Sequence, residues 1–359
     1  MIEFLRALPK VELHVHLEGS VPAELAVKLA RRNGTPLPAS DPAKLYRPWA
    51  SLADFLGTYQ AVCAAIVNPG DFAEVAYEAQ AEAARLGNLR YREIFFNPTN
   101  HPSMTYKQQL DAILDGLAGA EKDFGVVGRL IPAINREQPA SVATDLVAEV
   151  ITHRRDEVVG IGLDHDDSAG PAPLFAEAYA LAGRNGLRRT AHAGEVHTPS
   201  QITDSLDVLG CDRIDHGYLA LADPAIMGRL RGDGTHITTC WSTCVAHNPG
   251  TSPAKQPVTE MVAAGLRVSI NSDDPPMLGT DIGSEYVAAG TAMGWTREQA
   301  VAMTHAGLDG AWLDDSDRGA LRRSFDAEIA ALAGAAGSGS DGLFVTSNLH
   351  TETRKVFLA

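Results

Sequence analysis

The feature that most restricts the fold of this chain is a series of short apolar runs separated by stretches with helical periodicity. Eight runs can be distinguished, at residues 11–17 (VELHVHL), 89–96 (LRYREIFF), 126–134 (VVGRLIPAI), 158–163 (VVGIGL), 187–193 (LRRTAHA), 213–217 (RIDHG), 236–240 (HITTC) and 266–272 (LRVSINS). Between the first two runs, Phe72, Val75, Ala76 and Ala79 fall on one face of a helix. Strands that alternate with helices form a parallel sheet. Eight such units predict an α/β fold, a single (β/α)8 TIM barrel.

The segments outside this pattern predict where the barrel is extended. Residues 21–70 are longer than one crossover helix requires and contain several prolines, so we expect a helical insertion after strand 1, over the barrel mouth. Extra C-terminal helices are expected around 297–307 and 317–332. The run GAAGSGSDG begins at residue 334 and is typical of a flexible linker. The expected organisation is therefore a barrel over 1–333 and a linker with a C-terminal tail over 334–359.

Charge and cysteine content narrow the classes of partner. The formal net charge of -15 argues against a nucleic-acid surface, which requires clustered Lys and Arg. The four cysteines show no C-x-x-C spacing, which is typical of reduced thiols. The N-terminus lacks the long apolar region of a secretion signal, and no window approaches the ~18 apolar residues of a membrane span. We expect a cytoplasmic protein that acts on a small molecule and has no membrane partner, and the sequence does not give its oligomeric state.

Histidines at strand ends are the first candidates for chemistry. His14 and His16 are two residues apart on the first strand, so both side chains point to the same face and can bind one metal ion. The fifth run ends at His192, followed after a glycine by Glu195. Because the carboxyl ends of barrel strands meet at one mouth, His192 is expected near the first pair. Each feature taken alone has an ordinary structural explanation, such as a buried histidine bonded to backbone beside a solvent-facing glutamate.

Two further strand ends supply carboxylates and another histidine. The eighth run ends at Asp273 and Asp274. These residues can simply cap a following helix, but three imidazoles and one carboxylate also form a ligand set suited to zinc, with a position left for water. In that interpretation Asp273 is a ligand and Asp274 is free to hold substrate. The sixth run ends at Asp215 and His216, and a histidine beside the metal site can orient water or take its proton.

The other histidines carry less information. Two of them, His165 and His197, lie in loops after the fourth and fifth runs, where they can line a pocket. The rest have no partner at ligand spacing and are predicted to lie at the surface or in the core: His101, His153, His236, His247, His305 and His350.

Four sequence blocks together resemble the adenosine and adenine deaminase family of metal-dependent barrel hydrolases. The blocks are LPKVELHVHLEGS (8–20), TAHAGE (190–195), RIDHGY (213–218) and SINSDDPPMLGT (269–280), and the similarity spans about residues 8 to 330. The resemblance implies one zinc ion per chain, held by His14, His16, His192 and Asp273. It also implies that Glu195 protonates the ring nitrogen beside the amino-bearing carbon. His216 and Asp273 would then orient and deprotonate the attacking water, and Asp274 would hydrogen-bond the imidazole half of the purine.

Departures from the family pattern bear on the substrate. Glu18 stands where adenosine-specific members usually carry an aspartate that contacts the ribose, and Asp215 stands where they usually carry glycine. His165 replaces a glycine or serine near the purine, and the run TTCWSTC lacks the usual proline and asparagine. In contrast, DDPPMLGTD is more similar to the nucleoside branch. We expect Glu18, His165, Asp215 and Asp274 to contact substrate, together with Phe55 in the matching run SLADFL (51–56).

The function expected from these residues is zinc-dependent deamination of adenosine to inosine and ammonia. Adenine or a modified adenosine derivative is an alternative substrate within the same class. A non-catalytic, metal-containing purine-binding barrel and an amide or lactam hydrolase on the same kind of barrel are alternatives from other classes.

Overall fold

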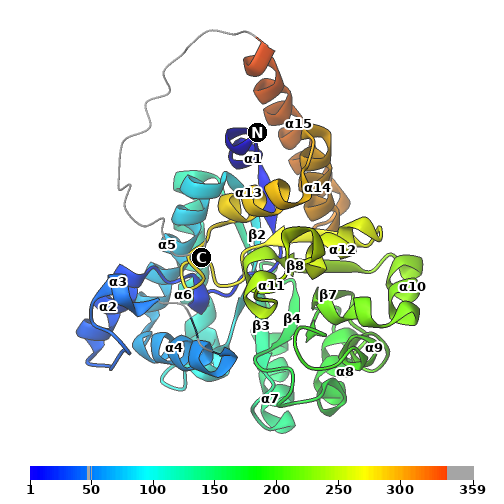
Figure 1. Ribbon diagram of the computed structural model, residues 1–359. Coiled ribbons are helices and arrows are strands. Elements are labelled where there is room, and N and C mark those ends of the chain that lie inside the picture. The colour runs from blue at the N-terminus through cyan, green and yellow to red at the C-terminus, as the bar shows by residue number, and fades with distance from the viewer. Residues whose placement is uncertain (47–48, 50, 338–359) are drawn as a thin grey trace.

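The computed structural model describes residues 1–46, 49 and 51–337, and its interior is a ring of parallel strands enclosed by helices (Figure 1). The hydrogen-bonded order is β1-β2-β3-β4-β5 in one sheet and β6-β7-β8-β9 in the other. The strands are β1 (Lys10–Glu12), β2 (Leu89–Phe96), β3 (Val127–Asn135), β4 (Gly160–Asp164), β5 (Arg188–Arg189), β6 (His192–Ala193), β7 (Arg213–His216), β8 (His236–Cys240) and β9 (Arg267–Asn271).

Backbone hydrogen bonds close these two sheets into one barrel. β5 and β6 are pieces of the fifth apolar run, and Thr190 between them donates to the carbonyl of Ile161 in β4. At the other junction, the backbone N–H of His16 donates to Asp273 at 2.9 Å, and that of Asp273 donates to His14 at 3.2 Å. Each of the eight apolar runs therefore contributes to the barrel wall, and the expected (β/α)8 fold is confirmed.

Helices surround the barrel because each buries one apolar face against it. The helix α5 begins with a capping box of Asn68 and Asp71, and it buries the predicted face that starts at Phe72. The helices that follow strands are α5 (Pro69–Gly87), α6 (Tyr106–Phe124), α7 (Ala140–Thr152), α8 (Ala176–Arg184), α9 (Ser200–Asp207), α10 (Pro224–Asp233), α11 (Trp241–His247), α12 (Pro257–Ala263) and α13 (Ile282–Met293).

The expected insertion after the first strand is helical in its described part. It contains α2 (Ala23–Asn33), α3 (Pro42–Leu45) and α4 (Leu52–Ala65), and α4 contributes side chains to the cavity at the barrel mouth. A short helix, α1 (Ile2–Ala7), precedes β1. No helix in the described part of the chain is both long and apolar enough to cross a membrane.

The C-terminal helices are α14 (Arg297–Gly310) and α15 (Asp315–Gly337). Helix α15 continues through residues 334–337, so the first part of the expected linker is helical. Two alanines in this stretch, Ala335 and Ala336, have the highest intrinsic helix propensity and account for the extension. The remainder of the expected linker and tail, 338–359, lies outside the described residues.

Candidate functional site

A cavity of about 330 Å³ opens at the carboxyl ends of the strands. Its floor is polar and is formed by side chains from the strand ends: His16, Asp164, His165, His192, Glu195, His216, Asp273 and Asp274. Its walls are apolar and come from α4, α11 and adjoining loops: Trp49, Leu52, Phe55, Leu56, Ala246, Pro249 and Leu278. This combination of an apolar enclosure with convergent polar groups is typical of a small-molecule site.

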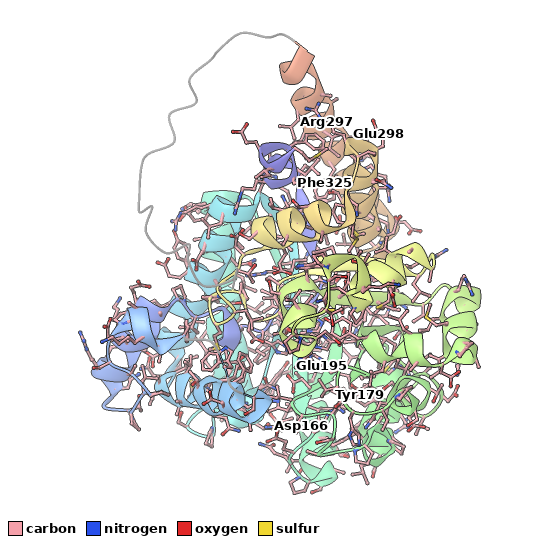
Figure 2. The ribbon with its side chains drawn as sticks, viewed as in Figure 1. Asp166, Tyr179, Glu195, Arg297, Glu298 and Phe325 are labelled. Carbon is pink, nitrogen blue, oxygen red and sulfur yellow. The ribbon has the colours of Figure 1, made fainter. Side chains whose placement is uncertain are left out.

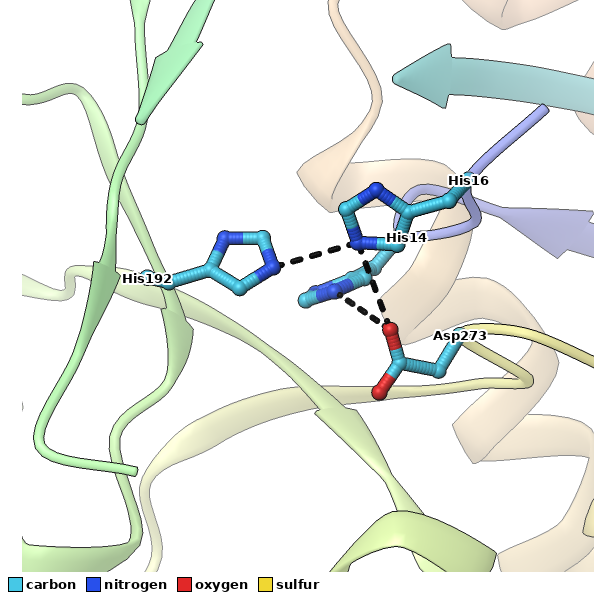
Figure 3. A group of neighbouring side chains, drawn as sticks. All are labelled: His14, His16, His192 and Asp273. Carbon is cyan, nitrogen blue, oxygen red and sulfur yellow. Dashed lines mark hydrogen bonds and ion pairs between the residues drawn. The ribbon is translucent and has the colours of Figure 1, made fainter. Parts of the chain in front are cut away.

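Three imidazoles and one carboxylate meet at the floor (Figure 3). His16 Nε2 lies 3.2 Å from His192 Nε2 and 3.4 Å from Asp273 Oδ1, and His14 Nε2 lies 3.2 Å from the same oxygen. Atoms that bind one zinc ion at about 2.0–2.1 Å lie no more than roughly 4.2 Å apart. The structure therefore brings the four predicted ligands together, and the three distances above are short enough for one shared ion.

The second nitrogen of each histidine faces an acid, directly for His16 and His192 and through Thr238 for His14. Asp215 Oδ2 lies 3.4 Å from His192 Nδ1, and Asp215 also accepts from Thr238, whose hydroxyl is 3.1 Å from His14 Nδ1. Asp164 Oδ2 lies 3.6 Å from His16 Nδ1. Partners of this kind fix the ring orientation and leave Nε2 free for a metal.

The hydrogen-bonding state of the buried atoms in this cluster indicates whether a cation fits there. His14 is completely buried, and its Nε2 has no hydrogen-bond partner among the described residues. The facing Nε2 atoms of His16 and His192 cannot both donate to each other. A divalent metal ion accepts electron pairs from all of these atoms at once, so the donor set fits a resident metal.

Glu195 and His216 lie beside the metal-type cluster. Glu195 is in the central part of the molecule in Figure 2. Its Oε2 is 3.6 Å from His216 Nε2, and its Oε1 is 2.8 Å from His247 Nε2. Burial lowers the pKa of His216 to about 3, because the carboxylate of Glu195 does not offset the loss of water around the charged ring. His216 is therefore a neutral imidazole, the form that can take a proton.

Asp273 and Asp274 have opposite electrostatic surroundings although they are adjacent. Asp273 Oδ2 accepts from Thr243 at 2.6 Å, and despite burial its pKa is well below the usual range because His14 and His16 face it. Burial raises the pKa of Asp274 well above its usual range, and the negative Asp273 adds to this effect. Asp274 also packs against Gly19, where a Cβ atom would lie 1.6 Å from its Oδ1. Glycine at position 19 is required for this close approach.

Residues with a left-handed backbone conformation direct their side chains into the cavity. His165, His216 and Asp273 have φ values of 68°, 64° and 64°, and Asn88, far from the site, is the one other non-glycine residue with positive φ in the described part of the chain. Such conformations cost energy and persist only where the surroundings enforce them. Their concentration at the ends of β4, β7 and β9 makes these strand ends candidates for function.

The predicted substrate contacts divide into two groups. Asp274, His165 and Phe55 line the cavity, as expected. Glu18 and Asp215 are completely buried and do not line it, so the expectation that they contact substrate is revised. Glu18 accepts from the backbone of Asn97 at 2.9 Å, and Asp215 lies 3.4 Å from the predicted ligand His192. Both carboxylates turn inward because a buried charge needs such donors.

Three polar cavity residues that contact the predicted groups are not themselves among the predicted site residues. His247 is predicted at the surface or in the core, yet it bonds Glu195. Thr243 and Asp164 carry no distinguishing spacing in the sequence. The run TTCWSTC, which departs from the family pattern, contains Thr243 and ends three residues before His247.

Comparison with known proteins places this geometry among purine deaminases. The family model described as "Adenosine deaminase" matches residues 9–328. The adenine deaminase of Streptomyces coelicolor is 35% identical over 334 residues, covering 91% of this chain and 96% of the relative. The adenine deaminase of Schizosaccharomyces pombe is 34% identical, covering 86% of this chain and 88% of the relative.

Solved structures show the same similarity. An adenine deaminase from Arthrobacter aurescens superposes with a TM-score of 0.84 at 30% identity, over 91% of this chain and 99% of that chain. An amidohydrolase from Burkhoderia ambifaria with bound Zn superposes with a TM-score of 0.85 at 32% identity, over 94% of each chain. The N6-methyl-AMP deaminase of Arabidopsis thaliana, at 24% identity and a TM-score of 0.81, shares the fold.

Proposed function

Because the chain belongs to the adenosine deaminase family, we propose that it is a zinc-dependent deaminase that hydrolyses adenine to hypoxanthine and ammonia. The chain is a hydrolase that acts on the carbon–nitrogen bond of a purine. The choice of adenine, of zinc and of individual residue roles is the proposal, and it revises the expectation that adenosine is the principal substrate.

Zinc is supported by the donor set and by the zinc in the Burkhoderia ambifaria relative. His14, His16, His192 and Asp273 would hold the ion. When bound, zinc would lower the pKa of a water molecule so that it becomes a nucleophile near neutral pH.

The chain's own residues would then move the protons. Glu195 would protonate the ring nitrogen beside the amino-bearing carbon, which makes that carbon electrophilic. His216, neutral and facing the cavity, would take a proton from the attacking water with the help of Asp273. Asp274, on the cavity floor, would hydrogen-bond the imidazole half of the purine.

The position of Glu18 is the observation that favours adenine over adenosine. Its carboxylate accepts from the backbone of Asn97, from His101 at 3.1 Å and from Tyr59 at 3.3 Å, and it does not line the cavity. The acid that would contact a ribose in adenosine-specific members is thus engaged elsewhere. Three of the relatives named above are adenine deaminases, which agrees with this geometry.

The apolar wall supports a second candidate, a purine that carries an apolar substituent. Leu52, Phe55 and Leu56 extend the cavity beyond the polar floor. Among the described residues that line the cavity there are carboxylates but neither Lys nor Arg. A phosphate group would meet repulsion there, so nucleotides are not proposed as substrates.

Ammonia release from adenine, adenosine, 2'-deoxyadenosine and AMP tests the proposal with the zinc-loaded protein. We expect adenine to be turned over fastest and AMP not at all. Faster turnover of adenosine would overturn the choice of substrate. Absence of turnover with every purine would favour the non-catalytic purine-binding barrel, while a Glu195→Gln variant with undiminished activity would remove the proposed acid.

A cytoplasmic location is also proposed. All four cysteines, Cys63, Cys211, Cys240 and Cys244, are buried and free of disulfides, which suits a reducing compartment.

A further inference from the structure

Helix α11 presents two side chains to the cavity from consecutive turns. Thr243 Oγ1 donates to Asp273 Oδ2 at 2.6 Å, and His247 Nε2 donates to Glu195 Oε1 at 2.8 Å. Residues four apart lie on one helix face, so a single helix contacts both of the acids that the proposed reaction uses. The helix end is fixed, because Asn248 Nδ2 donates to the carbonyl of Cys244 at 2.8 Å.

We propose that His247 is a positioning residue that holds the proton Glu195 gives to the purine ring and returns one to Glu195 after each turnover. This inference rests on the proposed function, since it assigns Glu195 the role of acid. It adds a partner for that acid which the sequence blocks shared with the family do not include.

The geometry places His247 between Glu195 and solvent. The two oxygens of Glu195 each face one imidazole, His216 on Oε2 and His247 on Oε1. The side chain of His216 is 1% exposed and that of Glu195 is 9% exposed, whereas that of His247 is 21% exposed. Of these three groups, His247 is the one that exchanges protons readily with water.

The charges explain why Glu195 needs such a partner. Although burial opposes it, His216 and His247 lower the pKa of Glu195 to about 2. Burial acts to lower the pKa of His247, but the bond to Glu195 and the charges of Glu195, Asp273 and Asp167 raise it overall. The shared proton therefore resides on His247 rather than on Glu195, and the pair titrates as one unit.

The proton balance of the reaction is complete with this arrangement. Glu195 takes the proton from His247 and passes it to the ring nitrogen, where it remains in the product. Of the two protons of the attacking water, one passes through His216 to the departing ammonia and the other is released to solvent as the new carbonyl forms. His247 takes one proton from solvent, so one water enters and one ammonia leaves.

The pH dependence of a His247→Gln variant tests this role. Glutamine can still donate a hydrogen bond to Glu195 but cannot carry a proton at neutral pH. We expect kcat/KM at neutral pH to fall by at least about tenfold, and the alkaline decline of activity to move to lower pH because Glu195 must hold the proton alone. A uniform loss at every pH, or an unchanged profile, would overturn the proposal.

A spectroscopic measurement gives a readout that is independent of turnover. In zinc-loaded protein with isotope-labelled histidine, the His247 signal, assigned by its absence in His247→Gln, should titrate above the ordinary histidine range near 6.5. In Glu195→Gln its pKa should fall. An identical His247 titration in both proteins would contradict the pairing, whatever the substrate proves to be.

His305→Gln is the matched control. His305 Nε2 lies 3.0 Å from Asp326, and its side chain is 24% exposed against 21% for His247, so it is a histidine of similar exposure that faces a carboxylate outside the cavity. This variant should keep the wild-type pH profile and the His247 titration. If the wild-type protein deaminates no purine, the proposed function fails, but the titration still shows whether His247 and Glu195 share a proton. If the wild-type protein is active and His247→Gln has the same pH profile, only the proposed role of His247 fails.

Discussion

Replacement of Asp215 by asparagine should weaken metal binding although Asp215 is not itself a predicted ligand. One carboxylate of this completely buried residue serves two ligands: Oδ2 faces His192 Nδ1 at 3.4 Å, and Oδ1 is bonded at 2.7 Å by Thr238, the partner of His14. Asparagine keeps the volume but presents an NH2 group in place of one acceptor oxygen, so the two rings cannot both keep their orientation.

The expected magnitude follows from the number of ligands affected. Loss of one outer partner of a metal ligand costs about 10–100-fold in affinity. Because Asp215 supports two histidines, we expect the upper end, about 100-fold, which corresponds to about 2.8 kcal/mol at about 1.4 kcal/mol per tenfold. Competition between the protein and a chelator for zinc, measured at fixed pH, gives this number directly.

Asp212→Asn is the matched control for that measurement. Asp212 forms a 2.9 Å ion pair with Arg188 near the start of the strands, and its other partner is the backbone N–H of Arg189 rather than a predicted ligand. Its replacement should leave zinc affinity unchanged. The reasoning is refuted if a folded Asp215→Asn protein binds zinc as tightly as the wild type, or if Asp212→Asn loses affinity to the same degree.

Three further results are expected. Asp273→Asn should lose zinc, whereas Asp274→Asn should retain zinc and lose turnover. Equal zinc content of the two variants in elemental analysis would show that the two residues do not have these separate roles. Phe72→Ala removes a completely buried ring and should destabilise the fold by about 3–5 kcal/mol, seen as a lower Tm in calorimetry, and an unchanged Tm would contradict its place in the core. Burial raises the pKa of Glu285 to about 7, although hydrogen bonds such as that from Ser242 act to lower it. Glu285 therefore contributes fully to stability below its unfolded pKa of about 4.3, and this contribution is lost as pH rises towards 7. Glu285→Gln should therefore gain Tm relative to the wild type between about pH 5 and about pH 8, and a constant difference would argue against a protonated Glu285.

The barrel was predictable because its strands are enclosed on both faces. The segment 158–163 (VVGIGL) is a continuous apolar run, and in the structure every residue of β4 is buried. Helix periodicity likewise identified the buried face of α5. The end of α15 was less predictable, since the small residues after Leu332 suit both a linker and a helix.

The candidate ligands were predictable for a topological reason, and other site residues were not. Parallel strands deliver their last residues to one mouth, so His192 and Asp273 were expected near His14. Whether a residue at a strand end faces the cavity depends on local backbone and on partners distant in sequence. Asp215 turns towards two histidines, and His247 reaches Glu195 from 52 residues away; neither relation leaves a spacing that can be read from the chain.

The backbone hydrogen bonds of Asp273 with His14 and His16 lie at the seam where the first and last strands of the barrel meet. The predicted ligands are distributed across that seam, with His14 and His16 on one side and Asp273 on the other. An ion held there would connect the first strand of the barrel to the last one. Loss of the ion would then destabilise the fold as well as stop catalysis. The free energy of unfolding would therefore increase with the concentration of free metal ion.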